Sequence, residues 1–225
     1  FPTGMKWRTV REDPCPTKYV VCNAAEGEPG TFKDRWLLRM NPYQVVEGLA
    51  IAAHAVGAER AFIGIKAGFE QEVQRLGTAM EEMAARDLVG PVPVELVQGP
   101  DEYLFGEEKA LLEVIEGNAP LPRVVPPWME GLFRTPDSPN PTAVNNVETL
   151  ANVPHIMRNG RAWFRSRGTE GSPGTMIFTL SGDVANPGLY ELPLGYSLGD
   201  LVFGVGGGPP EGRELKVVVP GASKG

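Results

Sequence analysis

Three short apolar stretches, each followed by a stretch with helical periodicity, constrain the fold of this chain most. The apolar stretches cover residues 19–22, 61–66 and 92–97, and the expected helices cover residues 41–58, 68–88 and 104–116. Parallel strands need a crossover connection of this kind, whereas antiparallel strands need only a turn. The alternation of strand and helix therefore predicts an α/β fold built on a doubly wound, mostly parallel sheet.

Two of the expected helices carry clear local signals. The stretch 41–58 begins with an asparagine and a proline, which favour the first turn of a helix. The stretch 68–88 places apolar side chains on one side and charged side chains on the other, as an amphipathic helix requires. These apolar side chains are Phe69, Val73, Leu76, Met80 and Met83.

The sequence changes character after residue 116. Residues 120–141 are dense in proline and are predicted to lack regular structure. Thr142–Met157 is predicted to resume as a helix, and residues 158–174 are predicted to form a connector. From Thr175 onward, short strands, an Asn-Pro-Gly turn, a short helical piece from Ser197 and a last strand over residues 215–221 predict a small α+β module.

We divide the chain into three parts on this basis. The main domain is predicted to cover residues 1–152, the connector residues 153–171, and the small module residues 172–225.

The composition narrows the function classes. The net charge is −7 and there is no basic cluster, so nucleic acid is not an expected partner. No long apolar run of about 18 residues is present, so we expect no direct insertion into a membrane. The cysteines Cys15 and Cys22 form no metal-ligand pattern and no disulfide framework, which favours a reducing, cytoplasmic setting.

Acidic residues and glycines gather where two of the predicted strands end. Glu26 and Glu28 follow the first strand, and Gly106, Glu107 and Glu108 follow the third. Ligands of doubly wound sheets bind outside the carboxyl ends of the strands, and carboxylates accept hydrogen bonds from sugar hydroxyls. The pattern therefore predicts a site for a ligand with a hydroxylated chain. The alternatives are a solvated acidic turn after the first strand and simple stabilisation of a helix start by the second pair of glutamates.

Other polar and aromatic residues extend this candidate site. Lys6 is a candidate cation for a phosphate, and the alternative is an exposed lysine. Asn145 and Asn146 are candidate ligand contacts, and the alternative is helix capping. The aromatic side chains that are candidates for stacking on a ring, or else for packing, are Tyr103, Phe105 and Trp128. No Ser/His/Asp set, Cys/His pair or metal cluster can be assembled, so neither a catalytic side chain nor a metal ligand is predicted.

Five blocks of the sequence, in order and at consistent spacing, resemble one known family. The blocks are "FPTGMKW", "CNAAEGEPGTFKDR", "YLFGEEKALLEVIEG", "NPTAVNNVETLANV" and "GTMIFTLSGDVANPGLYELPLG". Over its whole length the chain resembles the ~51-kDa flavin-bearing, NADH-oxidising subunit of respiratory NADH:quinone oxidoreductase. Related diaphorase subunits of NAD-linked hydrogenases and formate dehydrogenases share these blocks.

This resemblance implies a Rossmann-like domain for FMN and NADH, followed by a ubiquitin-like β-grasp module of the soluble-ligand-binding (SLBB) type. In the family, NADH gives a hydride to FMN and electrons leave singly to iron–sulfur clusters, so the protein positions and tunes the flavin. The implied partners are other subunits of an NADH dehydrogenase-type complex, among them a thioredoxin-like [2Fe–2S] subunit. The implied location is cytoplasmic, peripheral to the membrane where the complex is respiratory.

The motifs also imply which residues contact the two nucleotides. The FMN contacts carried over by motif are Lys6, Asn23, Glu26, Tyr103, Gly106, Glu107, Asn145, Asn146 and Thr149. The NADH contacts carried over by motif are Phe1, Glu28, Glu108 and Trp128.

Some positions depart from the family pattern. Ala25 stands where the family has an FMN-binding aspartate, Gly27 where it has a serine, and Val125 where it has an NADH-contacting lysine. Losing an aspartate bond to the ribityl chain would cost about 1.5–3 kcal/mol of FMN binding. These departures predict a divergent paralogue that serves an accessory dehydrogenase. A non-catalytic scaffold subunit without flavin is an alternative, and so is a relative whose β-grasp module binds another small ligand.

We also expect the chain to be a segment of a longer protein. The resemblance places the glycine-rich flavin loop before Phe1 and a [4Fe–4S]-binding Cys-x-x-Cys-x-x-Cys motif after Gly225, both outside the 225 residues.

Overall fold

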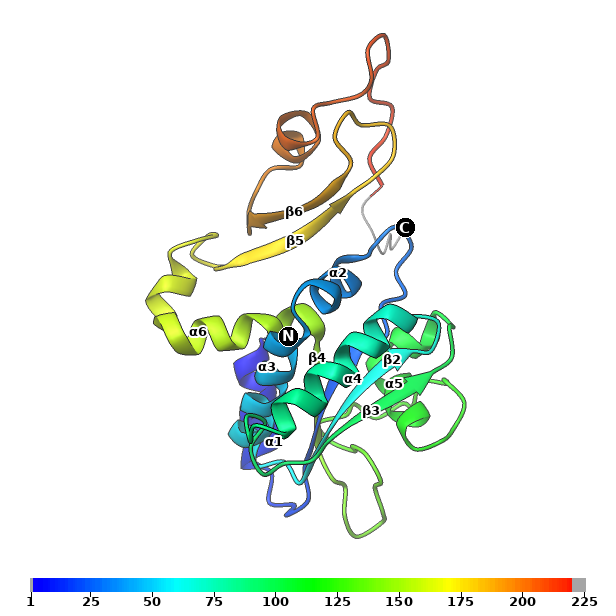
Figure 1. Ribbon diagram of the computed structural model, residues 1–225, viewed down its shortest axis with the longest axis vertical. Coiled ribbons are helices and arrows are strands. Elements are labelled where there is room, and N and C mark those ends of the chain that lie inside the picture. Colours follow the sequence, from blue (N-terminus) through cyan, green and yellow to red (C-terminus); the bar gives the residue numbers. More distant parts are fainter. Residues whose placement is uncertain (1, 220–225) are drawn as a thin grey trace. The chain divides into compact units, whose positions relative to one another are not determined.

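In the computed structural model, which describes residues 2–219, a four-stranded parallel sheet organises the first part of the chain (Figure 1). Its strands are β1 (Tyr19–Ala24), β2 (Arg60–Lys66), β3 (Val94–Gly99) and β4 (Thr142–Asn146). They lie in the order β3-β2-β1-β4, and every neighbouring pair is parallel. The predicted α/β fold with a parallel sheet is confirmed.

The chain separates into two compact units. The first comprises residues 1–27 and 34–154, and the second comprises residues 28–33 and 155–225. The sheet belongs to the first unit, which therefore also holds most of the predicted site residues.

Helices connect the parallel strands, as the crossover argument requires, and one more helix lies before the first strand and one after the last. They are α1 (Thr3–Glu12), α2 (Lys33–Met40), α3 (Pro42–Val56), α4 (Glu70–Ala84), the single 3-10 turn η1 (Leu104–Gly106), α5 (Glu108–Ile115) and α6 (Val147–Arg165). The predicted helices over 41–58 and 68–88 correspond to α3 and α4, and the helix predicted over 104–116 is the pair η1 and α5.

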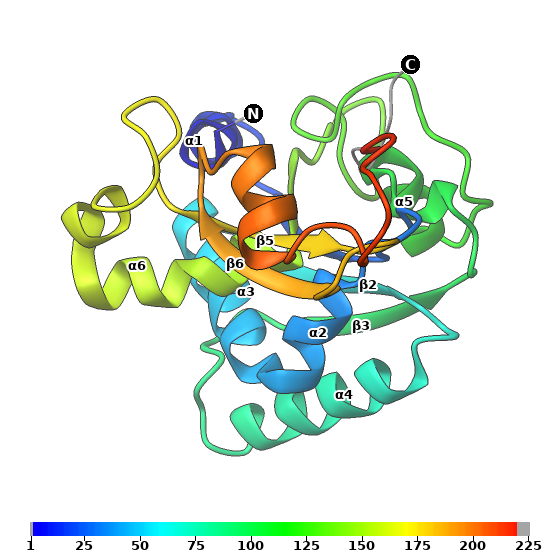
Figure 2. The same cartoon turned by 90° about the horizontal axis from the view of Figure 1, so that it is seen from above.

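Apolar side chains cover both faces of the sheet. On one face, Val20 and Cys22 of β1 belong to a core that includes side chains of α1, α3 and α4. On the other face, Val21 and Phe62 pack with a smaller core that includes Leu111 of α5. Figure 2 shows α4 and α5 on opposite sides of β3. Because both faces are covered, the central strands are apolar almost throughout instead of alternating with polar residues.

The helix predicted from residue 142 is wrong over its first turn. Thr142–Asn146 is the strand β4, and α6 begins at Val147. Thr142 lies opposite Tyr19 in the register of β4 with β1. This strand owes its conformation to a partner more than a hundred positions away in the sequence, which the local helical periodicity cannot reveal.

Two further helical segments were not predicted. The first is α1, where the sequence "FPTGMKW" reads as a turn, and the second is α2, which follows the acidic loop directly. The connector predicted over residues 158–174 is also partly helical, because α6 continues to Arg165 with a break at Gly160. Charged and aromatic side chains in this stretch obscure the helical period.

Side chains tie the proline-rich segment, residues 120–141, to the sheet domain. It contains no helix or strand, in agreement with the prediction. Arg123 is buried and donates to the carboxylates of Glu113 and Glu116 and to the carbonyl of Gly131. Glu116 also accepts the backbone N–H of Phe133 at 2.7 Å. Buried charge-assisted hydrogen bonds therefore replace regular secondary structure in holding this segment.

The second unit contains a two-stranded antiparallel sheet. Its strands are β5 (Thr175–Leu180) and β6 (Gly188–Pro193), joined through the predicted Asn-Pro-Gly turn. The short helical piece expected from Ser197 is present: residues 198–199 are α-helical and continue into the π-helical turn η2 (Asp200–Val205), and Ser197 Oγ accepts from the N–H of Asp200. The strand predicted over residues 215–221 is wrong for residues 215–219, which pair with no described strand, and its last two residues lie outside the described range. Valine-rich sequence favours extended backbone, but a strand also needs a partner edge.

Replacing Gly48 with alanine should destabilise the first unit. A Cβ atom at Gly48 of α3 would lie 2.0 Å from the carbonyl oxygen of Leu150 in α6, so the two helices would have to separate. We expect Gly48→Ala to lower the free energy of unfolding by about 1–3 kcal/mol, measured by urea denaturation.

Gly77 provides the matched control, because it is also inside a helix but a Cβ atom there has no neighbour within 4 Å. Gly77→Ala should raise the free energy of unfolding by about 0.5–1 kcal/mol. Equal effects of the two substitutions would contradict the close approach of α3 and α6.

Candidate functional site

The order of the strands creates a crevice at the carboxyl ends of β1 and β4. From β1 the chain builds outward through β2 and β3, and then returns to add β4 on the opposite side of β1. Such a switch point is where doubly wound sheets bind ligands, because the connections leave in opposite directions and leave a gap. A cavity of about 330 Å³ lies here. Its lining residues are Thr3, Lys6, Asn23, Gly106, Glu108, Val144, Asn145, Asn146 and Thr149.

Lys6 supplies a mostly buried cation to this cavity. Its Nζ donates to Glu108 Oε2 at 3.1 Å and to the carbonyl oxygen of Val144 at 2.9 Å. An ammonium group carries three hydrogens, so one remains for a ligand. Glu108 accepts this bond through one oxygen, and its other oxygen is left to accept from a hydroxyl. The alternative of a solvent-exposed lysine does not hold for Lys6, whose side chain is only 13% exposed.

Asn145 is held in a fixed orientation by Trp7. The indole Nε1 of Trp7 donates to Asn145 Oδ1 at 2.7 Å. With its oxygen occupied, the buried amide of Asn145 presents its NH₂ group as a hydrogen-bond donor. The residue that fixes this donor lies on α1, one position beyond Lys6, so one helix orients two polar groups of the cavity.

Asn23 and Asn146 line the cavity, and their side chains also form hydrogen bonds between neighbouring elements of the fold. Asn23 Nδ2 donates to the carbonyl of Gly106 at 2.8 Å, and its Oδ1 accepts from the N–H of Ala25. Asn146 Nδ2 donates to Asp34 Oδ2 at 2.7 Å, and its Oδ1 accepts from the N–H of Glu148 in the first turn of α6. The alternative reading of Asn146 as a helix cap is therefore correct in part.

The loop after β1 and the η1 turn approach each other backbone to backbone. A Cβ atom at Gly106 would lie 2.8 Å from the carbonyl oxygen of Ala25 and 3.8 Å from the amide nitrogen of Gly27. Ala25 itself is fully buried in the core on the α5 side of the sheet. Its methyl group packs where a carboxylate would have to be buried, so the surroundings of position 25 suit the alanine.

Glu26 and Glu107 act as helix caps. The carboxylate of Glu26, only 3% exposed, accepts from the N–H of Asp34 and from the Nε of Arg35, both at 3.0 Å, at the start of α2. Glu107 accepts from the N–H groups of Lys109 and Ala110 at the start of α5. Neither lines the cavity, and a contact of either with a ligand stays a prediction.

The remaining predicted residues lie outside the cavity lining. Tyr103 is 58% exposed beside η1, and the half-buried ring of Trp128 has Lys6 Nζ 6.0 Å from its centroid. Glu28 belongs to the second unit, where its carbonyl accepts from the N–H of Thr31. Phe1 lies outside the described residues.

Sequence reasoning missed the residues that orient the site. Thr3 lines the cavity, Trp7 holds Asn145, and Asp34, buried at the start of α2, holds Asn146. The positions of Thr3, Lys6 and Trp7, three or four residues apart, would have placed them on one side of a helix had α1 been predicted. No local signal links Asp34 to Asn146, which lies 112 positions away.

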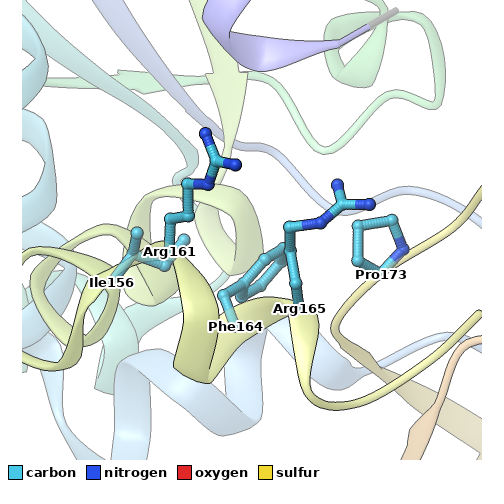
Figure 3. Close-up of a pocket in the computed structure, with 5 residues that line it drawn as sticks. All are labelled: Ile156, Arg161, Phe164, Arg165 and Pro173. Carbon is cyan, nitrogen blue, oxygen red and sulfur yellow. The ribbon is translucent and has the colours of Figure 1, made fainter. Parts of the chain in front are cut away.

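A second cavity, of about 390 Å³, lies within the second unit. It is lined by Ile156, Arg161, Phe164, Arg165 and Pro173, and Figure 3 shows both guanidinium groups projecting from the same helical segment. None of the predicted site residues lines it. Arg165 donates to the carbonyl of Glu170 at 3.2 Å, so part of this surface serves the local structure.

Comparison with known protein families shows which family this chain belongs to. Residues 1–155 match the family model described as the Nuo51 FMN-binding domain. The chain belongs to this family. Residues 177–220 match the SLBB domain, which confirms that a module of this type follows the FMN-binding domain.

The relatives of this Nuo51-family chain are subunits of larger oxidoreductases. It is 45% identical over 98% of its length to an F-type subunit of NADH-quinone oxidoreductase from Rhizobium meliloti. It is 39% identical, over its full length, to the HndC subunit of the NADP-reducing hydrogenase of Solidesulfovibrio fructosivorans. Among solved structures, an NAD⁺-reducing [NiFe]-hydrogenase chain matches with a TM-score of 0.85 and 44% identity, over 93% of this chain and 35% of that chain.

The chain spans about half the length of these curated relatives, 54% of the first and 47% of the second. Within residues 2–219, no helix is both long enough and apolar enough to cross a membrane.

Replacing Glu26 with glutamine should weaken the start of α2. The substitution keeps the shape of a nearly fully buried side chain but removes the charge that pairs with Arg35 and caps the helix. We expect Glu26→Gln to lower the free energy of unfolding by about 1–3 kcal/mol in chemical denaturation.

The control is Glu82→Gln on the exposed face of α4, where the side chain is 49% exposed and lies 4.0 Å from Arg86. A surface pair of this kind contributes at most about 0.5 kcal/mol. If Glu26→Gln were as mild as Glu82→Gln, the capping role of Glu26 would be wrong.

Proposed function

We propose that the full protein oxidises NADH with a bound FMN and passes the electrons to iron–sulfur partners within a larger complex. The observation that carries this proposal is the polar cavity at the β1/β4 switch point, in a chain of the Nuo51 FMN-binding family. Seven residues expected to contact FMN or NADH from the motifs line that one cavity. They are Lys6, Asn23, Gly106, Glu108, Asn145, Asn146 and Thr149.

The donor set of the cavity fits a flavin nucleotide. Lys6 offers a cation with one unused hydrogen, Asn145 offers an oriented NH₂ group, and Thr149 adds a hydroxyl. Gly106 lets the flat backbone of η1 form part of the wall, because it presents no side chain. Bound FMN would supply the capacity to accept a hydride and release electrons one at a time.

The residues of this chain would bind and orient the nucleotides. Lys6 and Asn145 would fix the ribityl phosphate, and Thr149 would assist them. Glu108 would accept from a sugar hydroxyl of NADH, with Glu28 and Trp128 as further proposed contacts. We propose no acid or base among the side chains, because hydride transfer between the two cofactors needs none from the protein.

The proposed partners follow from the relatives. Subunits named for NADH-quinone oxidoreductases and NAD-reducing hydrogenases work inside multi-subunit enzymes, so we propose that this protein does too. A thioredoxin-like [2Fe–2S] subunit is the proposed neighbour, and a [4Fe–4S] cluster is proposed for a part of the protein outside this chain. The proposed location is cytoplasmic.

Reconstitution tests the proposed function directly. The full-length protein, incubated with FMN and desalted, should be yellow and should reduce ferricyanide with NADH. A stably folded protein that stays colourless and inactive would refute the proposal and support a scaffold subunit without flavin. Retention of flavin without NADH oxidation would limit the function to flavin binding.

Replacing Trp7 with phenylalanine should weaken FMN binding. The change removes the N–H that holds Asn145 Oδ1, so the amide is free to turn away from the cavity. Loss of one oriented donor should raise the Kd for FMN about 5- to 15-fold, measured by quenching of flavin fluorescence.

Trp36→Phe is the matched control, because Trp36 is 48% exposed on α2 and lines no part of the cavity. It should bind FMN like the unmodified protein. An unchanged Kd in Trp7→Phe would contradict the role given to Trp7.

A further inference from the structure

Lys66, the last residue of β2, has a largely buried side chain that ends in a charged group still in contact with solvent. The residue is only 6% exposed, and among the described residues its ammonium group makes no hydrogen bond and no ion pair. Burial also lowers the pKa of this lysine below its ordinary value, with Arg35 adding to the effect and Asp101 and Glu26 opposing it. An ammonium group that touches solvent and is not engaged by a carboxylate is available to an anionic ligand.

Lys66 is surrounded by an aromatic ring, a second cation and two acids. The Nζ of Lys66 lies 5.8 Å from the centre of the Phe69 ring, and the guanidinium of Arg35 lies 4.9 Å from the same ring. Glu26 is the counter-ion of Arg35, and both of its oxygens already accept backbone or side-chain bonds. Asp101 accepts from the N–H of Gly68. A second cation therefore stands close to Lys66, Glu26 is engaged with that cation, and Asp101 attracts Lys66 without coming within ion-pair distance.

The ammonium group of Lys66 lies close against the backbone of the loop after β1. A Cβ atom at Gly27 would lie 3.2 Å from Lys66 Nζ and 3.3 Å from the carbonyl oxygen of Tyr103. A side chain at position 27 would crowd both groups, so the glycine is what allows the ammonium group to come this close to the loop. Gly27 adjoins Gly106, which lines the cavity, so the ammonium group stands just behind the loop at the same edge of the sheet.

We propose that Lys66 receives a phosphate of the nucleotide ligand bound at this sheet edge, a role that rests on the proposed function. Apart from Lys6, which is already paired with Glu108, the edge is rich in carboxylates, which repel phosphates, and a cation without an ion pair meets that need. Val125 stands where the family resemblance places a lysine toward NADH, so a phosphate-binding lysine from β2 would compensate for that change. The same chemistry suits the FMN phosphate and the pyrophosphate of NADH, and the test separates the two.

The test compares Lys66→Met with Lys66→Arg in the full-length protein. Methionine keeps the length and removes the charge, whereas arginine keeps the charge. We expect the Kd of the phosphate-bearing ligand to rise about 10- to 100-fold in Lys66→Met and to stay within a few-fold in Lys66→Arg. Binding of FMN, riboflavin and, in the flavin-loaded protein, NADH is measured by fluorescence titration.

The ligands identify which phosphate is bound. Weaker FMN binding with unchanged riboflavin binding assigns Lys66 to the flavin phosphate, and weaker NADH binding alone assigns it to the dinucleotide. Equal loss for riboflavin and FMN, or no loss for any ligand, overturns the inference. If the unmodified protein binds neither FMN nor NADH, it is the proposed function that fails.

Two further variants guard against a purely structural effect. Lys18→Met removes a lysine at the opposite end of the sheet, where Nζ donates to the carbonyl of Arg11, and should leave all three affinities unchanged. Gly27→Ala leaves the charge but places a Cβ atom 3.2 Å from Nζ, which displaces the ammonium group, and should weaken the same ligand as Lys66→Met. Without ligand, Lys66→Met should melt no lower than the unmodified protein, because an apolar group replaces a charge that has no ion pair in a residue that is only 6% exposed. A clear fall in its melting temperature with ligand binding intact would overturn the inference.

Discussion

The pairing of β4 with β1 is the constraint on which the candidate site depends. If β4 had paired with β3 instead, the strand order would run in one direction only. The loops that follow β1 and β4 would then not diverge, and no crevice would form between them. The pairing brings Asn23 and Asn146 opposite each other in register, one from each side of the reversal. It also places α1, α5 and the start of α6 around one opening, since each contributes lining residues. The cavity is thus a product of strand order more than of any single loop.

Acidic residues at this edge either cap helices or line the cavity, which explains why the sequence alone left both roles open for them. Glu26 and Glu107 satisfy the first N–H groups of α2 and α5 and so fix where those helices begin. Glu108, the immediate neighbour of Glu107, pairs with Lys6 inside the cavity instead. Adjacent glutamates on one helix start therefore perform different tasks, because successive positions of a helix point in different directions. Capping and ligand binding are complementary here, since the caps hold still the backbone that carries the ligand contacts.

The sequence predicted the fold class because its signals are local and repeated. Each of β1, β2 and β3 is a short apolar run followed by a helix pattern, and parallel pairing follows from that alternation. The prediction failed at Thr142–Asn146, where the strand is defined by a distant partner. It also failed at α1, which opens on Pro, Thr and Gly, and at α2, which at eight residues is too short to display a helical period. The motifs selected seven lining residues of the cavity, yet Trp7 and Asp34 were missed. Positioning residues of this kind have no chemistry of their own to mark them, and only the folded structure shows what they hold.

The burial of Arg123 also bears on how the chain meets proteases. The proline-rich segment is irregular and would seem an easy place to cut, and enzymes that cleave after arginine need that side chain in their specificity pocket. Arg123 has a side chain only 6% exposed and fastened to two glutamates, whereas Arg134, further along, is 37% exposed. A trypsin-like enzyme should therefore cleave this segment first after Arg134. The hydrogen bonds that hold this irregular segment in place of secondary structure therefore also protect Arg123, one of its two basic residues, from cleavage.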